Sequence, residues 1–167
     1  MEFFEGLGRL LGAESVRNVT IIIGVVIALA SVLAARSTAK KKQSADLLFN
    51  SRGDPLLQGG YLQVRDHHDS DTKNMRALAS GDKRHTDEAK QIRYLLNHFE
   101  SLSVGIQAGI YDESMLKMAW HGVVLEVHEK ALPFIKANRE RDKRDTIWQE
   151  FEWLAKRWKA APLKLRS

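Results

Sequence analysis

The hydrophobic positions of the chain begin with one unbroken apolar run near the amino terminus. Residues 19–35 carry no charge, and Thr20, Gly24 and Ser31 are the members that are not hydrophobic residue types. At a rise of about 1.5 Å per residue, this run makes a helix roughly 26 Å long, close to a hydrocarbon thickness of about 30 Å. The pattern therefore predicts a single transmembrane helix over residues 19–35.

Two other interpretations of this run stay open. One is a core helix of a soluble protein, but such helices are rarely bounded by charge as sharply as this run is by Arg17 and Arg36. The other is a cleaved secretory signal, because the small residues within 28–31 resemble a cleavage site. The segment before the run is long and carries three glutamates, whereas a secretory signal starts with a short positive stretch. We therefore expect a retained anchor.

Basic residues on the two sides of the run predict its orientation. Four cations follow it closely, namely Arg36, Lys40, Lys41 and Lys42, and two precede it. Because positive side chains stay on the cytoplasmic side, we expect residues 36–167 in the cytoplasm and the amino terminus outside a bacterial inner membrane. The same four cations are expected to bind anionic lipid of the inner leaflet, at about 1 kcal/mol each.

The rest of the chain repeats apolar positions at helical spacing, which predicts an all-α fold. We expect the transmembrane helix to be followed by a cytoplasmic bundle of four to five helices. The predicted segments are an amphipathic stretch 1–18, the transmembrane helix 19–35, a basic juxtamembrane helix or linker 36–53, the helical domain 54–161 and a basic tail 162–167.

Capping residues predict where several helices begin. Asp54 caps a helix that has Pro55 at its first position. Thr86 begins a helix that ends at Gly109, and Asp112 caps the helix after it. These local signals divide the middle of the chain into three helices.

Other signals predict interruptions and the last helix. The polar stretch 66–74 predicts a loop, followed by a short helical piece over 75–79. Pro133 is expected to kink or end the helix that contains it. Thr146 and Gln149 have the spacing of a capping box and predict the start of a final helix.

The composition narrows the possible chemistry. The chain of 167 residues has no cysteine, which excludes disulfides, thiolate metal sites and cysteine nucleophiles. The formal net charge is +5, but residues 43–167 hold 20 Lys or Arg against 18 Asp or Glu. Because the excess lies beside the expected bilayer and in the tail, we expect no basic face that binds nucleic acid.

One histidine-rich segment has the ligand types of a metal site. It contains His67, His68, Asp69 and Asp71, and imidazole and carboxylate groups bind zinc, nickel or manganese. Adjacent histidines converge poorly on one ion, so a solvated loop is the preferred interpretation and a metal site is the alternative. No cofactor is expected.

Two further residues are candidates for acid–base chemistry. Glu126 falls on the apolar side of its predicted helix, where a carboxylate needs an Arg, a Lys or backbone donors, or else binds a proton. A structural ion pair is preferred there over a catalytic acid. His98 is the second candidate. A membrane-tethered enzyme would require a histidine and a carboxylate that converge in one pocket.

A tryptophan near the carboxy terminus favours binding over catalysis. Trp153 points away from the apolar face of its predicted helix and lies beside Lys156 and Arg157. An exposed tryptophan among cations is a good anchor for a protein partner or for the bilayer interface. The alternative is that another segment of the same chain covers the ring.

Small residues in the anchor allow self-association. Thr20, Gly24 and Ala28 recur at every fourth position and form a stripe along one side of the predicted transmembrane helix. Such a stripe lets two helices approach closely, so a homo-oligomer is one expected arrangement.

Several short segments of the carboxy-terminal half resemble a known family. They are residues 97–100 (NHFE), 104–110 (VGIQAGI), 112–113 (DE), 133–135 (PFI) and 151–158 (FEWLAKRW). Residues 44–160 are similar to bacterial and prophage-encoded proteins that hold a domain of unknown function, often behind a single amino-terminal membrane helix. The resemblance implies a helical fold and an anchor, and it assigns no substrate, cofactor or catalytic residue. Gly59, Gly60 and the histidine-rich segment depart from the family's pattern.

These patterns together predict a function in binding. We expect a membrane-anchored adaptor that holds its helical domain beside the bilayer and increases its effective concentration for membrane-associated partners. The resemblance to prophage proteins adds the hypothesis of a prophage-related role. The alternative is a membrane-tethered enzyme or metal-binding protein that uses histidine and glutamate residues of the bundle.

Overall fold

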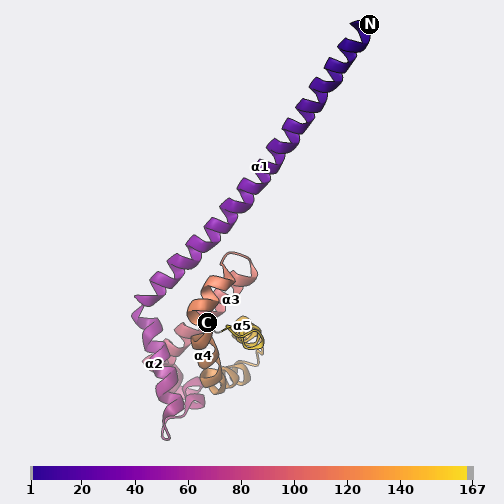
Figure 1. Ribbon diagram of the computed structural model, residues 1–167. Coiled ribbons are helices and arrows are strands. Elements are labelled where there is room, and N and C mark those ends of the chain that lie inside the picture. Colours follow the sequence, from indigo (N-terminus) through magenta and orange to yellow (C-terminus); the bar gives the residue numbers. More distant parts are fainter. Residues whose placement is uncertain (1, 165–167) are drawn as a thin grey trace. The chain divides into compact units, whose positions relative to one another are not determined.

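The protein is built from helices. The computed structural model describes the backbone of residues 2–164 and the side chains of residues 12, 14 and 17–164. This part of the chain has five α-helices, two short 3₁₀ helices and no β-strand (Figure 1). The helices are α1 (Glu2–Arg52), α2 (Pro55–Asp69), η1 (Met75–Ala79), η2 (Gly81–His85), α3 (Asp87–Gln107), α4 (Glu113–Asp142) and α5 (Gln149–Ala160). The predicted all-α fold, a long apolar helix followed by a bundle, is confirmed.

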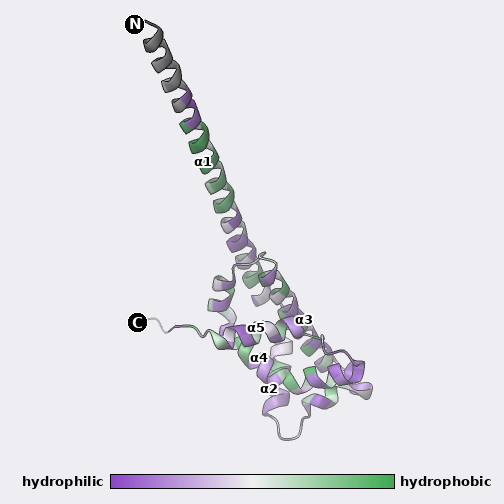
Figure 2. Ribbon diagram, turned by 90° about the vertical axis from the view of Figure 1, so that its right-hand side faces the viewer, coloured by the Kyte–Doolittle hydropathy of each residue, from purple (hydrophilic) through white to green (hydrophobic). Residues whose placement is uncertain are grey.

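The chain divides into two compact units, residues 1–39 and 40–167, and the division falls inside α1. In the first unit, Figure 2 shows the apolar run as a green stretch of helix. Among the described residues, this is the one helix long and apolar enough to cross a membrane, with a mean hydropathy of 2.5 over its most apolar window. None of that window is buried within the protein, unlike the core helix of a soluble protein.

Two predicted terminal segments are described in part. The side chains of residues 1–11 lie outside the described residues, so the amphipathic face expected over 1–18 has no structural counterpart here. The same holds for residues 165–167 of the expected basic tail. The backbone from Glu2 onward belongs to the same helix as the apolar run.

The turn from α1 into α2 follows the predicted cap. Asp54 accepts hydrogen bonds from the backbone N–H groups of Leu56 at 2.8 Å and Leu57 at 3.2 Å. Its second carboxylate oxygen accepts a hydrogen bond from the hydroxyl of Tyr94 at 2.8 Å. The Tyr94 hydroxyl first, and then the two N–H groups, hold the pKa of Asp54 below its usual value. The cap therefore also joins the start of α2 to α3.

The adjacent glycines of α2 allow this helix to approach α3 closely. A Cβ atom placed on Gly60 would lie 2.5 Å from the carbonyl oxygen of Gln91 and 2.8 Å from the Cβ of Leu95. Glycine lowers intrinsic helix stability, yet here it permits a backbone contact that no other residue allows. The helix that Asp54 and Pro55 predict therefore forms with both glycines inside it.

The histidine-rich segment is helical, so the loop predicted over 66–74 is wrong at its start. Helix α2 continues to Asp69, and the irregular stretch begins at Ser70. His67 is buried, with its Nδ1 3.0 Å from the carbonyl oxygen of Gln63 one turn earlier. His67 and Val64 are both buried on the inner face of α2, and this burial keeps the last turn helical despite its polar composition. The short helix predicted over 75–79 is confirmed as η1.

The predicted caps of α3 and α4 are confirmed. The hydroxyl of Thr86 accepts a hydrogen bond from the backbone N–H of Ala89 at 3.4 Å, and the carboxylate of Asp112 accepts one from Met115 at 3.0 Å. Gly109 has a φ of 69°, a left-handed conformation that glycine adopts without strain. These local bonds set the turn that joins α3 to α4.

Pro133 does not end its helix, which corrects one of the two predicted outcomes; a kink at Pro133 stays a prediction. Helix α4 continues from Glu113 through Pro133 to Asp142. The residues after the proline, Phe134 and Ile135, are completely buried. Burial of two large apolar side chains stabilises by roughly 1.5–3 kcal/mol each, which together offsets the cost of about 3 kcal/mol for a proline in a helix interior.

The start of α5 also differs from the prediction. Thr146 and Gln149 form no capping box; the N-cap residue is Trp148, which has a φ of 53° and makes no side-chain cap bond. The carboxylate of Glu100 on α3 takes this role, because it accepts a hydrogen bond from the backbone N–H of Phe151 at 2.7 Å. A second bond of 3.4 Å comes from the N–H of Glu150. A tertiary contact therefore replaces the local cap.

The core of the second unit lies between α2, α3, α4 and α5. Helix α3 packs against α2 and α5, and α4 packs against η1 and α5. The largest completely buried side chains are Ile92, Leu96, Leu102, Leu116, Phe134, Ile135, Phe151, Leu154 and Trp158. Phe99 of α3 and Phe151 of α5 stack with their ring centroids 5.2 Å apart. The apolar face of α5 thus covers one side of the bundle core.

Candidate functional site

A hollow between α4 and α5 contains the three residues predicted to bind a partner. It has a volume of about 540 Å³ and is lined by Glu113, Lys117, Trp153, Lys156, Arg157, Ala160 and Ala161. We name it the Trp153 hollow. Its α4 residues come from the first two turns of that helix, and its α5 residues come from the last two and a half turns.

The ring of Trp153 is held in place at the edge of the core. The side chain is half-buried and packs partly against the buried cluster, rather than standing fully exposed as expected. The guanidinium carbon of Arg157 lies 5.5 Å from the centre of the ring, within the range of a cation–π interaction. The ring therefore presents a fixed aromatic surface with a cation on it.

An ion pair crosses the Trp153 hollow. Arg157 donates from Nε to Oε1 of Glu113 at 2.7 Å and from Nη2 to Oε2 at 3.1 Å. The indole Nε1 of Trp158 donates to the same Oε1 at 3.1 Å. Arg157 is the main reason that the pKa of Glu113 lies below its usual value. The two helices are thus held at a defined distance on each side of the hollow.

Lys156 forms a second ion pair, with a carboxylate of its own helix. Its ammonium lies 2.6 Å from Oε1 of Glu152, whose Oε2 is 2.7 Å from Nη1 of Arg139. Lys156 and then Arg139 lower the pKa of Glu152 to about 2. The side chain of Lys156 is nevertheless 72% exposed, so its ammonium stays accessible to a ligand.

A further hollow lies next to the first and shares Lys156 with it. It has a volume of about 350 Å³ and is lined by Leu125, His128, Glu129, Leu132, Ala155, Lys156 and Lys159. Nε2 of His128 is buried and has no hydrogen-bond partner among the described residues, and burial lowers the pKa of this histidine. Lys117, Lys156, Arg157 and Lys159 outnumber Glu113 and Glu129, so the two hollows form a cationic strip with an apolar floor.

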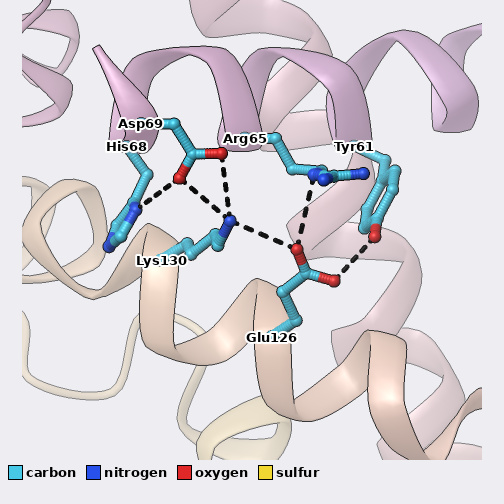
Figure 3. A network of polar contacts seen from close by, with 6 residues as sticks. All are labelled: Tyr61, Arg65, His68, Asp69, Glu126 and Lys130. Carbon is cyan, nitrogen blue, oxygen red and sulfur yellow. Dashed lines mark hydrogen bonds and ion pairs between the residues drawn. The ribbon is translucent and has the colours of Figure 1, made fainter.

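Glu126 lies in a network of polar contacts that joins α2 to α4 (Figure 3). Its Oε2 accepts a hydrogen bond from the Tyr61 hydroxyl at 2.7 Å, and its Oε1 lies 3.5 Å from Nε of Arg65 and 3.3 Å from Nζ of Lys130. We call these residues, with His68 and Asp69, the Glu126 network. The Tyr61 hydroxyl is the largest cause of a lowered pKa at Glu126. Glu126 thus makes ion pairs of the kind that the preferred interpretation predicts.

The predicted metal ligands do not converge. The carboxylate of Asp69 accepts hydrogen bonds from Lys130 at 3.1 and 3.3 Å, and its Oδ1 lies 2.9 Å from Nδ1 of His68. His67 is buried and bonded to its own helix, and Asp71 is exposed beyond the end of α2. Among the residues with described side chains, no three His, Asp or Glu groups lie close enough to share a metal ion.

His98 lines a small apolar hollow of its own. The hollow has a volume of about 170 Å³ and is lined by Ser51, Leu57, Gln58, Tyr61, Leu95, His98, Phe99, Trp120 and Val123. Burial lowers the pKa of His98, and its Nε2 is buried without a partner in the described part of the chain. Glu126 is not among the lining residues and bonds Tyr61 instead. The two candidates for acid–base chemistry therefore do not form a pair.

Comparison with known proteins gives one match. The family described as Domain of unknown function (DUF4760) matches residues 18–158. The chain belongs to the DUF4760 family. The resemblance to a family with a domain of unknown function is thus confirmed to that extent. No curated protein and no solved structure matches the chain.

The DUF4760 match includes the apolar run and the basic residues that follow it. Arg36, Lys41 and Lys42 are exposed, as lipid-binding side chains must be. Lys40 is also exposed, and its ammonium lies next to the turn between α3 and α4, 3.3 Å from where a Cβ on Gly109 would stand. One of the four predicted lipid contacts therefore also touches the helical domain.

The small-residue stripe lies in the first unit. Thr20, Gly24 and Ala28 are exposed, and nothing lies within 4 Å of a Cβ placed on Gly24. A second helix of the DUF4760 protein can therefore reach the stripe, although self-association through it stays a prediction.

Two parts of the candidate site were missed by sequence reasoning. Glu113 and Lys117 complete the Trp153 hollow, yet they lie about 40 residues before Trp153 in the chain. No periodic or motif signal connects segments at that separation. The helical register of α5 alone indicated the tryptophan and its cations.

Proposed function

We propose that this DUF4760 protein is a single-pass protein of a bacterial inner membrane that recruits a protein partner to the bilayer. In this proposal the amino terminus lies outside and the helical domain lies in the cytoplasm. The observation that carries the binding function is the Trp153 hollow, where a fixed aromatic ring and accessible cations meet.

The membrane setting is supported by composition and exposure. The apolar run has the length of a membrane span, and its side chains are exposed over residues 19–35. The cations at Arg36 and over 40–42 would hold the following segment against anionic headgroups. The resemblance to bacterial and prophage-encoded proteins supports a bacterial membrane and is the sole basis for a prophage-related role.

The chemistry of the Trp153 hollow indicates the kind of partner. Tryptophan and arginine are the residues most enriched among those that dominate binding energy at interfaces. The surplus of lysine and arginine along the cationic strip complements an acidic segment, and the apolar floor at Leu125 and Ala155 complements one apolar side chain of that segment. We therefore propose an acidic, amphipathic protein segment as the partner.

Anchoring at the membrane would increase the effectiveness of this binding site. A domain held at the membrane surface meets other membrane-bound proteins at a much higher effective concentration than it would in solution. A modest affinity at the Trp153 hollow then suffices for recruitment.

Site-specific crosslinking in intact membranes tests the binding function. A photoreactive amino acid at Ala160 lies inside the Trp153 hollow, and one at the exposed position Phe49 serves as a control. We expect a crosslinked partner from Ala160 that Trp153→Ala reduces at least fivefold and that the pair Lys156→Gln and Lys159→Gln reduces further. Helicity should be unchanged in both variants.

The identity of the crosslinked species decides between partners. An acidic protein segment crosslinked at Ala160 supports the proposal. Crosslinks to lipid alone would replace the protein partner by the bilayer interface, and equal crosslinking with and without Trp153→Ala would remove the hollow from the function.

A topology experiment tests the membrane setting separately. A reporter active only in the cytoplasm, fused after residue 167, should be active, and one active only in the periplasm should be inactive. The opposite pattern, or a protein found in the soluble fraction, would overturn the anchored arrangement.

A further inference from the structure

A fourth hollow of the helical domain is lined almost entirely by charged residues. Its volume is about 370 Å³, and its lining residues are Arg84, His85, Arg93, Arg141 and Asp142. They come from η2, from the second turn of α3 and from the end of α4. We name it the arginine hollow.

The arginine hollow is far from the Trp153 hollow. Glu113 and Arg141 are 28 residues apart on α4, which corresponds to roughly 42 Å along a continuous helix. The two hollows therefore lie at opposite ends of α4 and share no residue. Nothing about the arginine hollow depends on the partner site proposed above.

The charges of the arginine hollow are out of balance. Asp142 is the one carboxylate among its lining residues, and both of its oxygens accept hydrogen bonds from Arg141 at 2.7 Å. Arg84 and Arg93 form no ion pair with a carboxylate of the described residues. Two guanidinium groups therefore lie in the same hollow without an anion of their own.

The positions of these guanidinium groups are nevertheless defined by hydrogen bonds. Nη2 of Arg93 donates to the backbone carbonyl of Arg84 at 2.7 Å, and Nη1 of Arg141 donates to the carbonyl of Ala79. Nε of Arg84 donates to Nε2 of His85 at 2.7 Å, so that imidazole carries its proton on Nδ1. Each bond uses one edge of a side chain and leaves the other N–H donors of Arg84 and Arg93 without an acceptor among the described residues.

Holding like charges together in this way costs free energy. Burial first, and then the neighbouring charges of Arg141 and Arg84, lower the pKa of Arg93. A guanidinium stays protonated in a protein, so the repulsion persists until an anion enters. The repulsion would be relieved by a ligand that accepts several hydrogen bonds and carries one or two negative charges.

We propose that the arginine hollow binds a phosphate group. The arginine fork matches the spacing of phosphate oxygens, and a dianion matches two unpaired guanidinium groups. The volume of the hollow accommodates a phosphate with a small group attached to it. The phosphate is supplied either by a soluble phosphomonoester or by the headgroup of an anionic lipid.

A titration of the full chain with inorganic phosphate tests this site. The protein is held in maltoside micelles in a phosphate-free buffer, and binding is followed by calorimetry. We expect saturable binding of one phosphate per chain. The pair Arg84→Gln and Arg93→Gln should weaken it at least tenfold, Arg93→Lys should weaken it less, and Arg52→Gln should leave it unchanged, because Arg52 is exposed outside the hollow. Helicity by circular dichroism should be the same for all variants.

The same titration separates the two sources of phosphate. Micelles doped with phosphatidic acid should suppress the phosphate signal that depends on Arg84 and Arg93 if a lipid headgroup occupies the hollow, and should leave it intact if the natural ligand is soluble. Both results retain the phosphate site. It would be overturned by phosphate binding that persists unchanged without the two arginines, by no saturable binding, or by a dicarboxylate such as glutarate that binds equally well.

Discussion

Two charged clusters of the helical domain have similar side chains but differ in their balance of positive and negative charge. In the Glu126 network, Arg65 and Lys130 face the carboxylates of Asp69 and Glu126, so cations and anions are equal in number. In the arginine hollow, three guanidinium groups face Asp142 alone among the lining residues. The first cluster joins two helices, whereas the second leaves donors available.

The difference teaches how to distinguish a structural cluster from a binding site. A balanced network stabilises the fold as it stands, because each charge faces one of the opposite sign. An unbalanced cluster stabilises the fold only when a ligand supplies the missing charge. One variant that shifts α2, which supplies half of the balanced cluster, and variants within each cluster separate these effects.

The largest effect is expected at the glycine that sets the position of α2. A methyl group from Gly60→Ala would meet the carbonyl oxygen of Gln91 and the Cβ of Leu95, so α2 has to move away from α3. We expect a loss of about 1–3 kcal/mol in the free energy of unfolding, as for other overpacked sites. Thermal unfolding of the full chain, followed by circular dichroism, measures this loss.

The matched control for this variant is Gly122→Ala on α4. Nothing lies within 4 Å of a Cβ placed there, so the substitution should leave stability equal or raise it by about 0.5–1 kcal/mol. A Gly60→Ala protein as stable as Gly122→Ala would show that the α2–α3 contact is not as close as described.

A smaller effect is expected from neutralising the centre of the balanced cluster. Glu126→Gln keeps an acceptor for Tyr61 but removes the charge that Arg65 and Lys130 face, so we expect a loss of about 1 kcal/mol at neutral pH. Unfolding by urea measures the difference between the variant and the natural chain. Glu129→Gln, one turn along α4 and exposed, should have no effect.

The pH dependence of this difference has a definite sign. The pKa of Glu126 is lowered from an ordinary value of 4.5, so its contribution is complete above that value and is lost as the pH falls through the lowered one. The stability difference between the natural chain and Glu126→Gln should therefore shrink in acid. A difference that grows below pH 4.5 would contradict the network.

The smallest effect is expected from two arginine substitutions that change the free energy of unfolding in opposite directions. In low salt without phosphate, Arg65→Gln should destabilise by a few tenths of a kcal/mol, because it removes a partner of Glu126. Arg93→Gln should stabilise by a similar amount, because it removes a charge that is partly buried and lies beside Arg141 and Arg84. Both effects should decrease at high salt. Stability changes of the same sign in the two variants would contradict the distinction between the two clusters.

Much of the fold follows from local sequence signals. Asp54, Thr86 and Asp112 each cap the helix that begins directly after them, so the bond and the residue that makes it lie within three positions. Such signals predicted three of the five α-helix starts. The apolar run likewise carries its own evidence within seventeen residues.

The errors share one physical cause, which is tertiary burial. Pro133 remains inside α4 because the side chains after it are buried, and the turn around His67 is helical because its inner face is buried. The start of α5 depends on Glu100, which lies about 50 residues earlier in the chain. None of these contacts is visible in a local pattern.

The candidate sites divide along the same line. Trp153, Lys156 and Arg157 lie within one turn or so of each other, so helical spacing brought them together in advance. The arginine hollow combines residues 84, 93 and 141 from three elements, and no spacing rule connects them. Sequence patterns therefore identify the residues of a site that are close together in the chain. Residues that distant segments contribute to the same site are found only from the structure.

The bond from Glu100 to the start of α5 has a consequence for biosynthesis. A helix of 12 residues is marginal alone in water, and α5 takes its N-terminal cap from a helix that left the ribosome long before it. Until α5 leaves the ribosome, the face of Phe99 that stacks on Phe151 has no partner there. The core of the helical domain therefore closes only after α5 has been synthesised, and a chain that stops before α5 exposes an apolar surface that favours aggregation and proteolysis.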